Sequence, residues 1–142
     1  MASQRRPNVH TQTSFSSTSY SYGIVRVVPR VEREEFLNCG VVLFSLERKY
    51  LNALIHADHT RLQTLWPQLD LSELDSQLNA IERIAQGDPT AGPIALLPVR
   101  ERFHWLVSPR STVVQVSPVH TGLTTHPDQT LQCLFNTLVR NL

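Results

Sequence analysis

The sequence predicts an α+β domain in which helices pack on one face of a mostly antiparallel sheet of about five strands. Short stretches of alternating or continuously apolar residues predict the strands, and stretches with apolar residues every three or four positions predict the helices. Turns, not helices, join most neighbouring strands. The expected order is three strands, two helices, two strands and one helix, which differs from the regular alternation of a parallel sheet.

Composition limits the class of protein. The 142 residues suit one domain, and 41% of them are hydrophobic, as expected of a chain with a buried core. The formal net charge of +1 provides no general attraction for nucleic acid or for a membrane surface. No apolar run is long enough to span a bilayer, and none follows Arg5 and Arg6 as in a signal peptide. We therefore expect a cytoplasmic protein that binds neither membrane nor nucleic acid.

Serine and threonine dominate residues 1–19, around a single Phe15. Such a segment has too little apolar surface to offset the entropy that it would lose on ordering. We expect residues 1–19 to form a disordered tail and residues 20–142 to form the single α+β domain.

Three strands are expected in the first part of the domain. β-branched and aromatic residues fill 20–28, and a charged connection with the length for one helical turn follows over 30–36. Residues 39–46 are nearly all apolar, which is typical of a strand that is buried on both faces and central in its sheet. A polar turn leads to a third strand over 50–55, so the second and third strands are expected to form a hairpin.

Two helices are expected next. Asp58 is placed to cap a helix over 60–66, and Asp70 is placed to cap a longer helix whose leucine and isoleucine stripe covers 71–84. Proline and glycine are frequent in 88–100, which predicts a long irregular connection.

A second hairpin is expected over 102–116, because aromatic and β-branched residues alternate on both sides of a proline-containing turn. Arg110 would lie at the tip of this hairpin. A further turn at Ser117-Pro118 would then present His120 beyond the strands. A final helix, capped by Thr125, completes the predicted domain.

Two stretches resemble a bacterial family, the domain-of-unknown-function family 3037, and the resemblance covers the ordered chain from Tyr20 to Leu142. The first stretch matches at Val25-Arg26, Pro29-Arg30, Glu32, Glu35-Phe36, Asn38 and Gly40-Val41. The second matches at Arg102-Phe103, Trp105-Leu106, Pro109-Arg110-Ser111-Thr112, Gln115, Ser117-Pro118, His120 and Gly122. The resemblance implies no established activity. Members are often encoded beside kinase-like proteins of the persistence-toxin type, which implies a protein partner of that kind.

The candidate binding residues are the polar members of the two stretches: Arg26, Arg30, Glu32, Glu35, Asn38, Arg102, Arg110, Gln115 and His120. Arginines on rigid strands can clamp a phosphate or a carboxylate through two parallel hydrogen bonds. The alternative is an internal salt-bridge network, in which the glutamates neutralise the arginines and hold the connection between the first two strands.

Catalytic chemistry is less clearly indicated. His120 and Glu35 are the candidates for a general acid or base, but no nucleophile accompanies them in the sequence. A Cys39–His120 pair would resemble a thiol–imidazole dyad, although Cys39 opens an apolar strand. His56-Ala57-Asp58-His59 offers a metal ion only two imidazoles and one carboxylate, and Asp58 is better explained as a helix cap. We therefore expect no metal and no cofactor.

Two functions follow from these observations. The favoured one is a small cytoplasmic interaction or regulatory module for a protein partner, accessory to a kinase-like protein. The alternative is an enzyme or sensor of a phosphorylated or nucleotide-like small molecule. In the alternative, Arg26, Arg30 and Arg110 would hold the anion, His120 would act as acid or base, and Glu35 would orient it. The absence of a complete catalytic motif favours the module over the enzyme.

Overall fold

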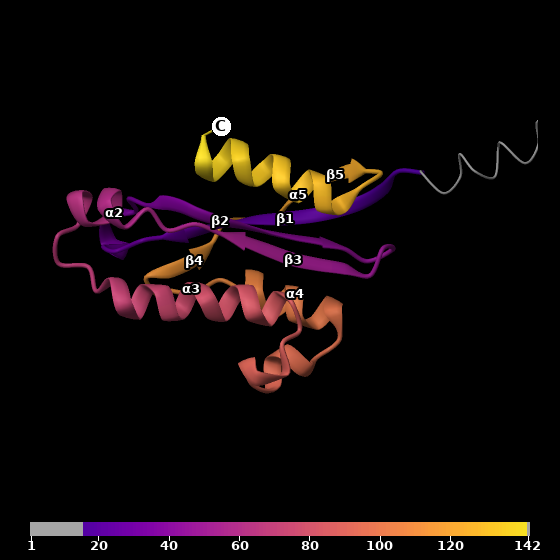
Figure 1. Cartoon of the computed structure of the whole chain (residues 1–142), viewed down its shortest axis with the longest axis horizontal. Helices are drawn as coiled ribbons and strands as arrows, with labels where there is room; N and C mark the ends of the chain where they lie inside the picture. The colour runs from indigo at the N-terminus through magenta and orange to yellow at the C-terminus, as the bar shows by residue number, and fades with distance from the viewer. Residues whose placement is uncertain (1–15, 142) are drawn as a thin grey trace, which may run out of the picture.

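The computed structural model describes residues 16–141 and confirms the α+β class. Its centre is a five-stranded antiparallel sheet in the order β3-β2-β1-β4, with β5 also paired to β1 (Figure 1). β1 (Thr18–Val27) pairs with β2 (Leu37–Ser45), and β2 pairs with β3 (Tyr50–Ile55). Seven of the nine residues of β2 are buried, as expected for a strand covered on both faces.

β4 (Val114–Val116) and β5 (His120–Thr124) form one interrupted strand along the other edge of β1. Val116 lies opposite Val25, whereas His120 lies opposite Tyr22, so the edge strand carries one extra residue between them. This arrangement is a β-bulge. The predicted turn at Ser117-Pro118 is therefore wrong, because the chain keeps its direction and Pro118 occupies a bulge of an edge strand, where a missing N–H is tolerated.

Ser117 lies in this bulge, and its side chain replaces a backbone hydrogen bond where the pairing with β1 is interrupted. The Ser117 hydroxyl accepts a hydrogen bond from the Ile24 N–H at 2.9 Å and donates to the Pro118 carbonyl at 2.9 Å. The Ser117 N–H in turn donates to the Ile24 carbonyl. Ser117 is buried, so its side chain holds the edge strand against β1 where the register changes.

Four α-helices lie within residues 16–141: α2 (His59–Leu65), α3 (Leu71–Ala85), α4 (Val99–Val107) and α5 (Pro127–Phe135). Asp58 and Asp70 cap α2 and α3 through their carboxylates, as predicted. The last helix begins after His126, not Thr125, and the Thr124 hydroxyl accepts the His126 N–H. A turn of π-helix, η5 (Asn136–Arg140), extends α5.

α4 replaces the predicted first strand of the second hairpin, so that hairpin is wrong. The alternating Phe103, Trp105 and Val107 suggested a strand, but Phe103 and Leu106 are the buried pair, and they stand three residues apart as on a helix. The ring of Phe103 stacks on Phe44 of β2 at 4.8 Å between centroids. Five strands are present as expected, because β5 takes the place of the strand lost to α4.

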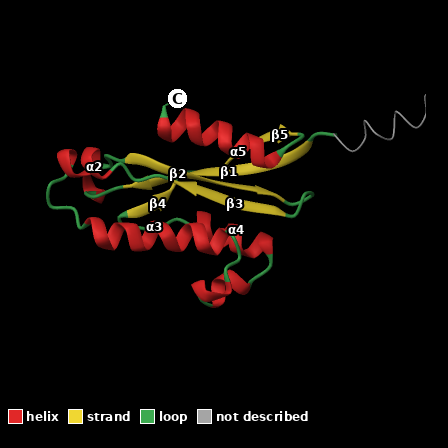
Figure 2. Cartoon of the chain, viewed as in Figure 1, coloured by secondary structure: helices red, strands yellow, loops and turns green. Residues whose placement is uncertain are grey.

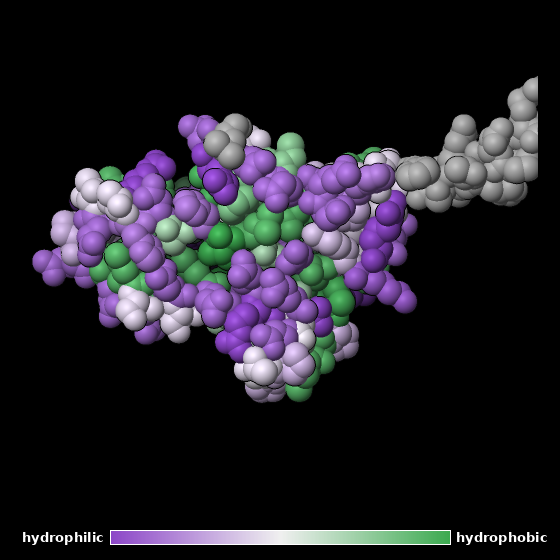
Figure 3. Space-filling view, in the orientation of Figure 1, coloured by the Kyte–Doolittle hydropathy of each residue, from purple (hydrophilic) through white to green (hydrophobic). Residues whose placement is uncertain are grey.

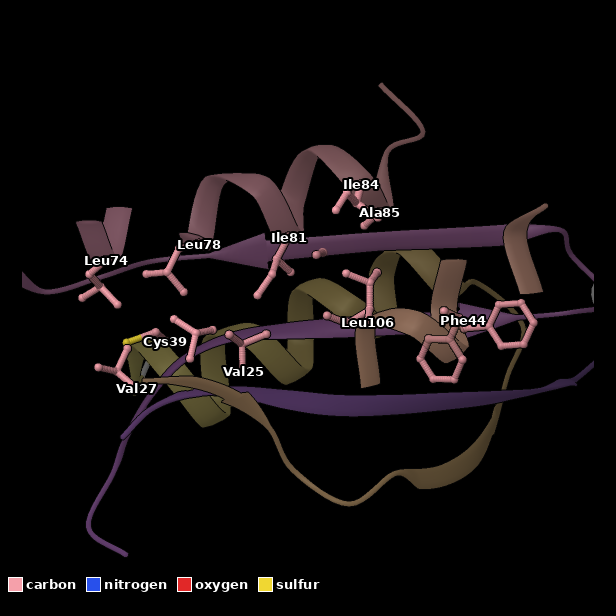
Figure 4. Packing of buried hydrophobic residues seen from close by; sticks show 14 of the residues in the cluster. Val25, Val27, Cys39, Phe44, Leu74, Leu78, Ile81, Ile84, Ala85 and Leu106 are labelled. Atoms are coloured by element: carbon pink, nitrogen blue, oxygen red, sulfur yellow. The ribbon is translucent and has the colours of Figure 1, made fainter. Parts of the chain in front are cut away.

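Helices cover both faces of the sheet, which corrects the expectation of one covered face (Figure 2). α3 and α4 pack on one face, where side chains of α3 such as Leu74 and Leu78 meet Val25 and Cys39 of the sheet (Figure 4). On the opposite face, α5 packs on β2 and β3 through Leu131 and its neighbours.

The strand β1 begins at Thr18, two residues earlier than expected, and residues 1–15 of the predicted tail lie outside the described residues. None of the helices in residues 16–141 is long and apolar enough to cross a membrane. On the side shown in Figure 3, apolar residues gather in the middle, between α5 and α3, where β3 forms the edge of the sheet.

Candidate functional site

Three of the candidate residues meet on β1 and its two neighbours. Arg26 lies opposite Asn38 of β2 and opposite Gln115 of β4. Residues directly opposite one another in an antiparallel pair share a face, so all three belong to the face that carries α5. The two sequence stretches that resemble the family therefore meet in space at β1.

A register shift in the pairing of β1 with β2 brings Asn38 into this group. The β1–β2 register shifts between Val25 and Arg26, which leaves Cys39 as the extra residue of a bulge. Because of this shift, Cys39 joins the buried cluster on the face that carries α3 and α4, whereas Asn38 lies on the same face as Arg26.

Arg26 and Asn38 each keep one buried polar atom without a partner. The Arg26 guanidinium lies over the Phe36 ring at 4.0 Å, and its Nε is buried without a hydrogen bond. The Asn38 Nδ2 donates to the Leu138 carbonyl at 3.2 Å, while Oδ1 is buried without a partner. Unsatisfied buried polar atoms are uncommon in folded proteins, and they mark places where a water or ligand can bind.

His120 lies on the same face but farther along the sheet. It pairs with Tyr22, with ring centroids 5.1 Å apart, and it is exposed. Tyr22 and Arg26 are four residues apart on one strand, about 13 Å along its axis. The His120 ring lies against Tyr22 and the Arg26 guanidinium lies over Phe36, so these two side chains have separate neighbours.

The charged connection forms local ion pairs, as in the salt-bridge alternative. Arg30 Nε donates to Glu32 at 2.9 Å, and Arg33 Nε donates to Glu35 at 2.7 Å. The hydrogen bond from Arg33 lowers the pKa of Glu35. The pKa of Glu32 is also lowered, first by a bond from its own backbone and then by Arg30. Glu35 is thus engaged with Arg33 rather than with His120.

Arg102 and Arg110 belong to the opposite side of the sheet, with α4. Arg102 Nη1 donates to the Leu97 carbonyl at 2.9 Å, and its guanidinium packs on Gly87. Arg110 lies over the Trp105 ring at 4.2 Å and donates to the Trp105 carbonyl at 2.6 Å. Partial burial lowers the pKa of Arg110. The candidate residues therefore divide between two faces.

An apolar groove beside α3 was not predicted. A groove of about 510 Å³ runs between α3 and the end of β1, and we call it the α3 groove. Its apolar lining comes from Pro29, Leu65, Trp66, Leu69, Leu74 and Val113. It continues past Gln77 into a smaller pocket of about 210 Å³ beside Trp105 and Arg110. The only local signal was an apolar Leu65-Trp66 pair at the end of a short helix.

The geometry does not support a Cys39–His120 dyad or a metal site at His56–His59. Cys39 is fully buried, and burial raises the pKa of its thiol to about 12, so it does not form a reactive thiolate. His59 contacts Asp75 at 2.8 Å. Among residues 16–141 there is no cluster of three or more histidine, cysteine, aspartate or glutamate side chains that could hold a metal ion.

Comparison with known proteins adds one match. The family described as "Protein of unknown function (DUF3037)" matches residues 22–139, which include both stretches discussed above. No curated protein and no solved structure matches the chain.

Proposed function

The chain belongs to the DUF3037 family, and we propose that it is a binding module whose α3 groove receives an apolar segment of a protein partner. The observation that carries this proposal is the groove itself, because a large, open, mainly apolar depression with few polar groups is the usual form of a binding site. Leu65 on its rim is 52% exposed. The partner class suggested by the family resemblance is a kinase-like protein of the persistence-toxin type.

The dimensions of the groove favour a short segment. Its two pockets follow α3 from Glu73 to Ile84, which is about 16 Å along the helix axis. An extended chain rises about 3.3 Å per residue, so about five residues would fill it.

Charges at the two ends favour one direction of binding. Asp70 and Glu73 line one end, and neither forms an ion pair among residues 16–141. Arg110 lines the other end, and its guanidinium contacts a carbonyl and an aromatic ring but no carboxylate in that part of the chain. We therefore expect the segment to carry a basic residue near Glu73 and an acidic residue near Arg110.

Addition of a partner strand to the sheet is less favoured than binding in the groove. On β3, the outward Ala53 N–H is bonded by the Asn52 side chain at 2.8 Å. On β4, the Thr112 hydroxyl donates to the Val114 carbonyl at 2.8 Å. Side chains that occupy backbone groups at a sheet edge are a known protection against pairing with another strand.

The alternative, an enzyme or sensor of a phosphorylated small molecule built on Arg26, Arg30, Arg110, His120 and Glu35, is not favoured. Arg26 and Arg110 lie on different faces of the sheet, while Arg30 and Glu35 are held in separate ion pairs. These groups would have to converge on one anion to form that site.

The test is the affinity of the full chain for a purified kinase-like protein encoded beside a member of this family. We expect a one-to-one complex by calorimetry. Leu65→Asp should weaken it by about tenfold or more, because burying a leucine is worth about 1.5–3 kcal/mol. The matched control is Leu96→Asp, since Leu96 is 67% exposed and lies outside the groove. Equal effects of both substitutions, or no complex at all, would contradict the proposal.

A further inference from the structure

A second, polar pocket lies at the end of α5, away from the α3 groove. It has a volume of about 190 Å³ and lies between the start of β2, α2 and η5. Its polar lining comes from Asn38, His56, Asp58, Arg61, Arg140 and Asn141. It adjoins a pocket of about 290 Å³ that shares Asn38 and Arg61 and extends to Phe36 and Thr137. Figure 1 shows α2 and the C-terminal end of the chain at the same end of the sheet.

From this pocket we infer a site for a phosphate group carried as a monoester. Arg61 comes from α2 and Arg140 from η5, so two elements distant in sequence bring two guanidinium groups to one cavity. Arginine matches the geometry of phosphate oxygens through paired N–H groups. The imidazole of His56 adds a further hydrogen-bonding group.

Within residues 16–141, no side chain forms an ion pair with either arginine of this pocket. Neither the Arg61 nor the Arg140 guanidinium has a hydrogen bond or an ion pair with any residue in 16–141. The one carboxylate in the lining is Asp58, and its Oδ1 already accepts the Arg61 backbone N–H at 3.1 Å as the cap of α2. Among the described residues that line the pocket, two guanidinium groups and one carboxylate leave a net charge of +1, which favours an anionic ligand.

The pocket also contains a buried polar atom beside the two arginines. Asn38 fixes η5 by its bond to the Leu138 carbonyl, and its buried Oδ1 has no partner. That oxygen can accept a hydrogen bond from a ligand hydroxyl or from a water bound beside it. The π-turn of η5 places Arg140 here, and such turns are frequent at functional sites.

Calorimetric titration of the full chain with inorganic phosphate tests this site, at constant ionic strength so that general screening is the same throughout. We expect saturable one-to-one binding. Arg61→Gln and Arg140→Gln should each raise the dissociation constant by about tenfold, as expected for loss of a charge-assisted hydrogen bond. Arg100→Gln is the matched control, because Arg100 is an exposed arginine on α4 outside the pocket.

A second titration, with a phosphoserine heptapeptide, distinguishes a phosphoprotein from a free phosphate ester as the source. Tighter binding of the peptide than of phosphate points to a phosphoprotein, and equal binding points to a small ester; both support the site if they depend on Arg61. Circular dichroism verifies folding, and Arg61→Lys retains the charge if Arg61→Gln does not fold. Absence of saturation, or an equal effect of Arg100→Gln, would overturn the inference while leaving the α3 groove untouched.

Discussion

The bulge between β4 and β5 depends on one serine hydroxyl, and Ser117→Ala tests this dependence. The substitution removes the acceptor of the Ile24 N–H, a bond of 2.9 Å, and leaves that amide partly buried without a partner. Loss of a buried partner costs about 1–3 kcal/mol. In a chain of this length, each kcal/mol lowers the melting temperature by about 4 °C. We therefore expect a fall of about 4–12 °C.

Urea unfolding at equilibrium measures this cost, and hydrogen exchange of the Ile24 amide locates it. Exchange of that amide should accelerate in the variant, because its bond to the Ser117 hydroxyl is lost. Ser111→Ala is the matched control, since Ser111 is exposed and should change stability by less than about 0.5 kcal/mol. If the two variants unfold at the same urea concentration and the Ile24 amide stays protected, the hydroxyl does not hold the bulge.

Three further predictions concern separate parts of the molecule. Gly122→Ala should lower the free energy of unfolding by about 1–3 kcal/mol, because a Cβ at this position would lie 2.6 Å from the Tyr20 hydroxyl oxygen. In a double-mutant cycle, the same substitution should cost much less in a chain that already carries Tyr20→Ala. A thiol reagent near pH 8 should modify exposed Cys133 in the native protein and reach Cys39 only after unfolding, and two fast-reacting thiols would contradict the burial that raises the pKa of Cys39. Hydrogen bonds from Thr90, and then from Arg83, lower the pKa of Asp88. The ionised Asp88 therefore stabilises the fold fully above its ordinary pKa, and this stabilisation is lost as the pH falls below about 4. Asp88→Asn should make the free energy of unfolding less dependent on pH in that range, and an unchanged dependence would contradict this role of Asp88.

Local signals explain the parts of the fold that the sequence predicted correctly. Asp58 and Asp70 cap their helices because a carboxylate next to a helix start satisfies free N–H groups within three residues. The apolar run of β2 has no polar face to present to water, so it was expected in the middle of the sheet. Neither inference needed knowledge of any distant part of the chain.

The errors arise where distant contacts decide the structure. The segment around Phe103 and Trp105 fits both a strand and a helix, and the stacking of Phe103 on Phe44 helps to select the helix. The α3 groove joins Trp66 to Val113, and no local pattern relates those positions. Arg26 and Gln115 were predicted as candidates separately, but only the pairing of β1 with β4 places them opposite one another.

α2 links the two proposed sites, since it carries Leu65 at the groove and Arg61 at the polar pocket. A helix of seven residues is unstable alone, so α2 depends on its Asp58 cap and on the burial of Leu62. Asp58→Ala should cost about 1 kcal/mol and speed hydrogen exchange of the α2 amides, with weaker binding at the α3 groove. Phosphate binding does not report on the cap alone, because this substitution also removes the carboxylate that lines the polar pocket. Asp70→Ala is the matched control, because it removes the same kind of cap from the longer α3. If the α2 amides exchange equally fast in both variants, the cap does not hold α2 in place for either site.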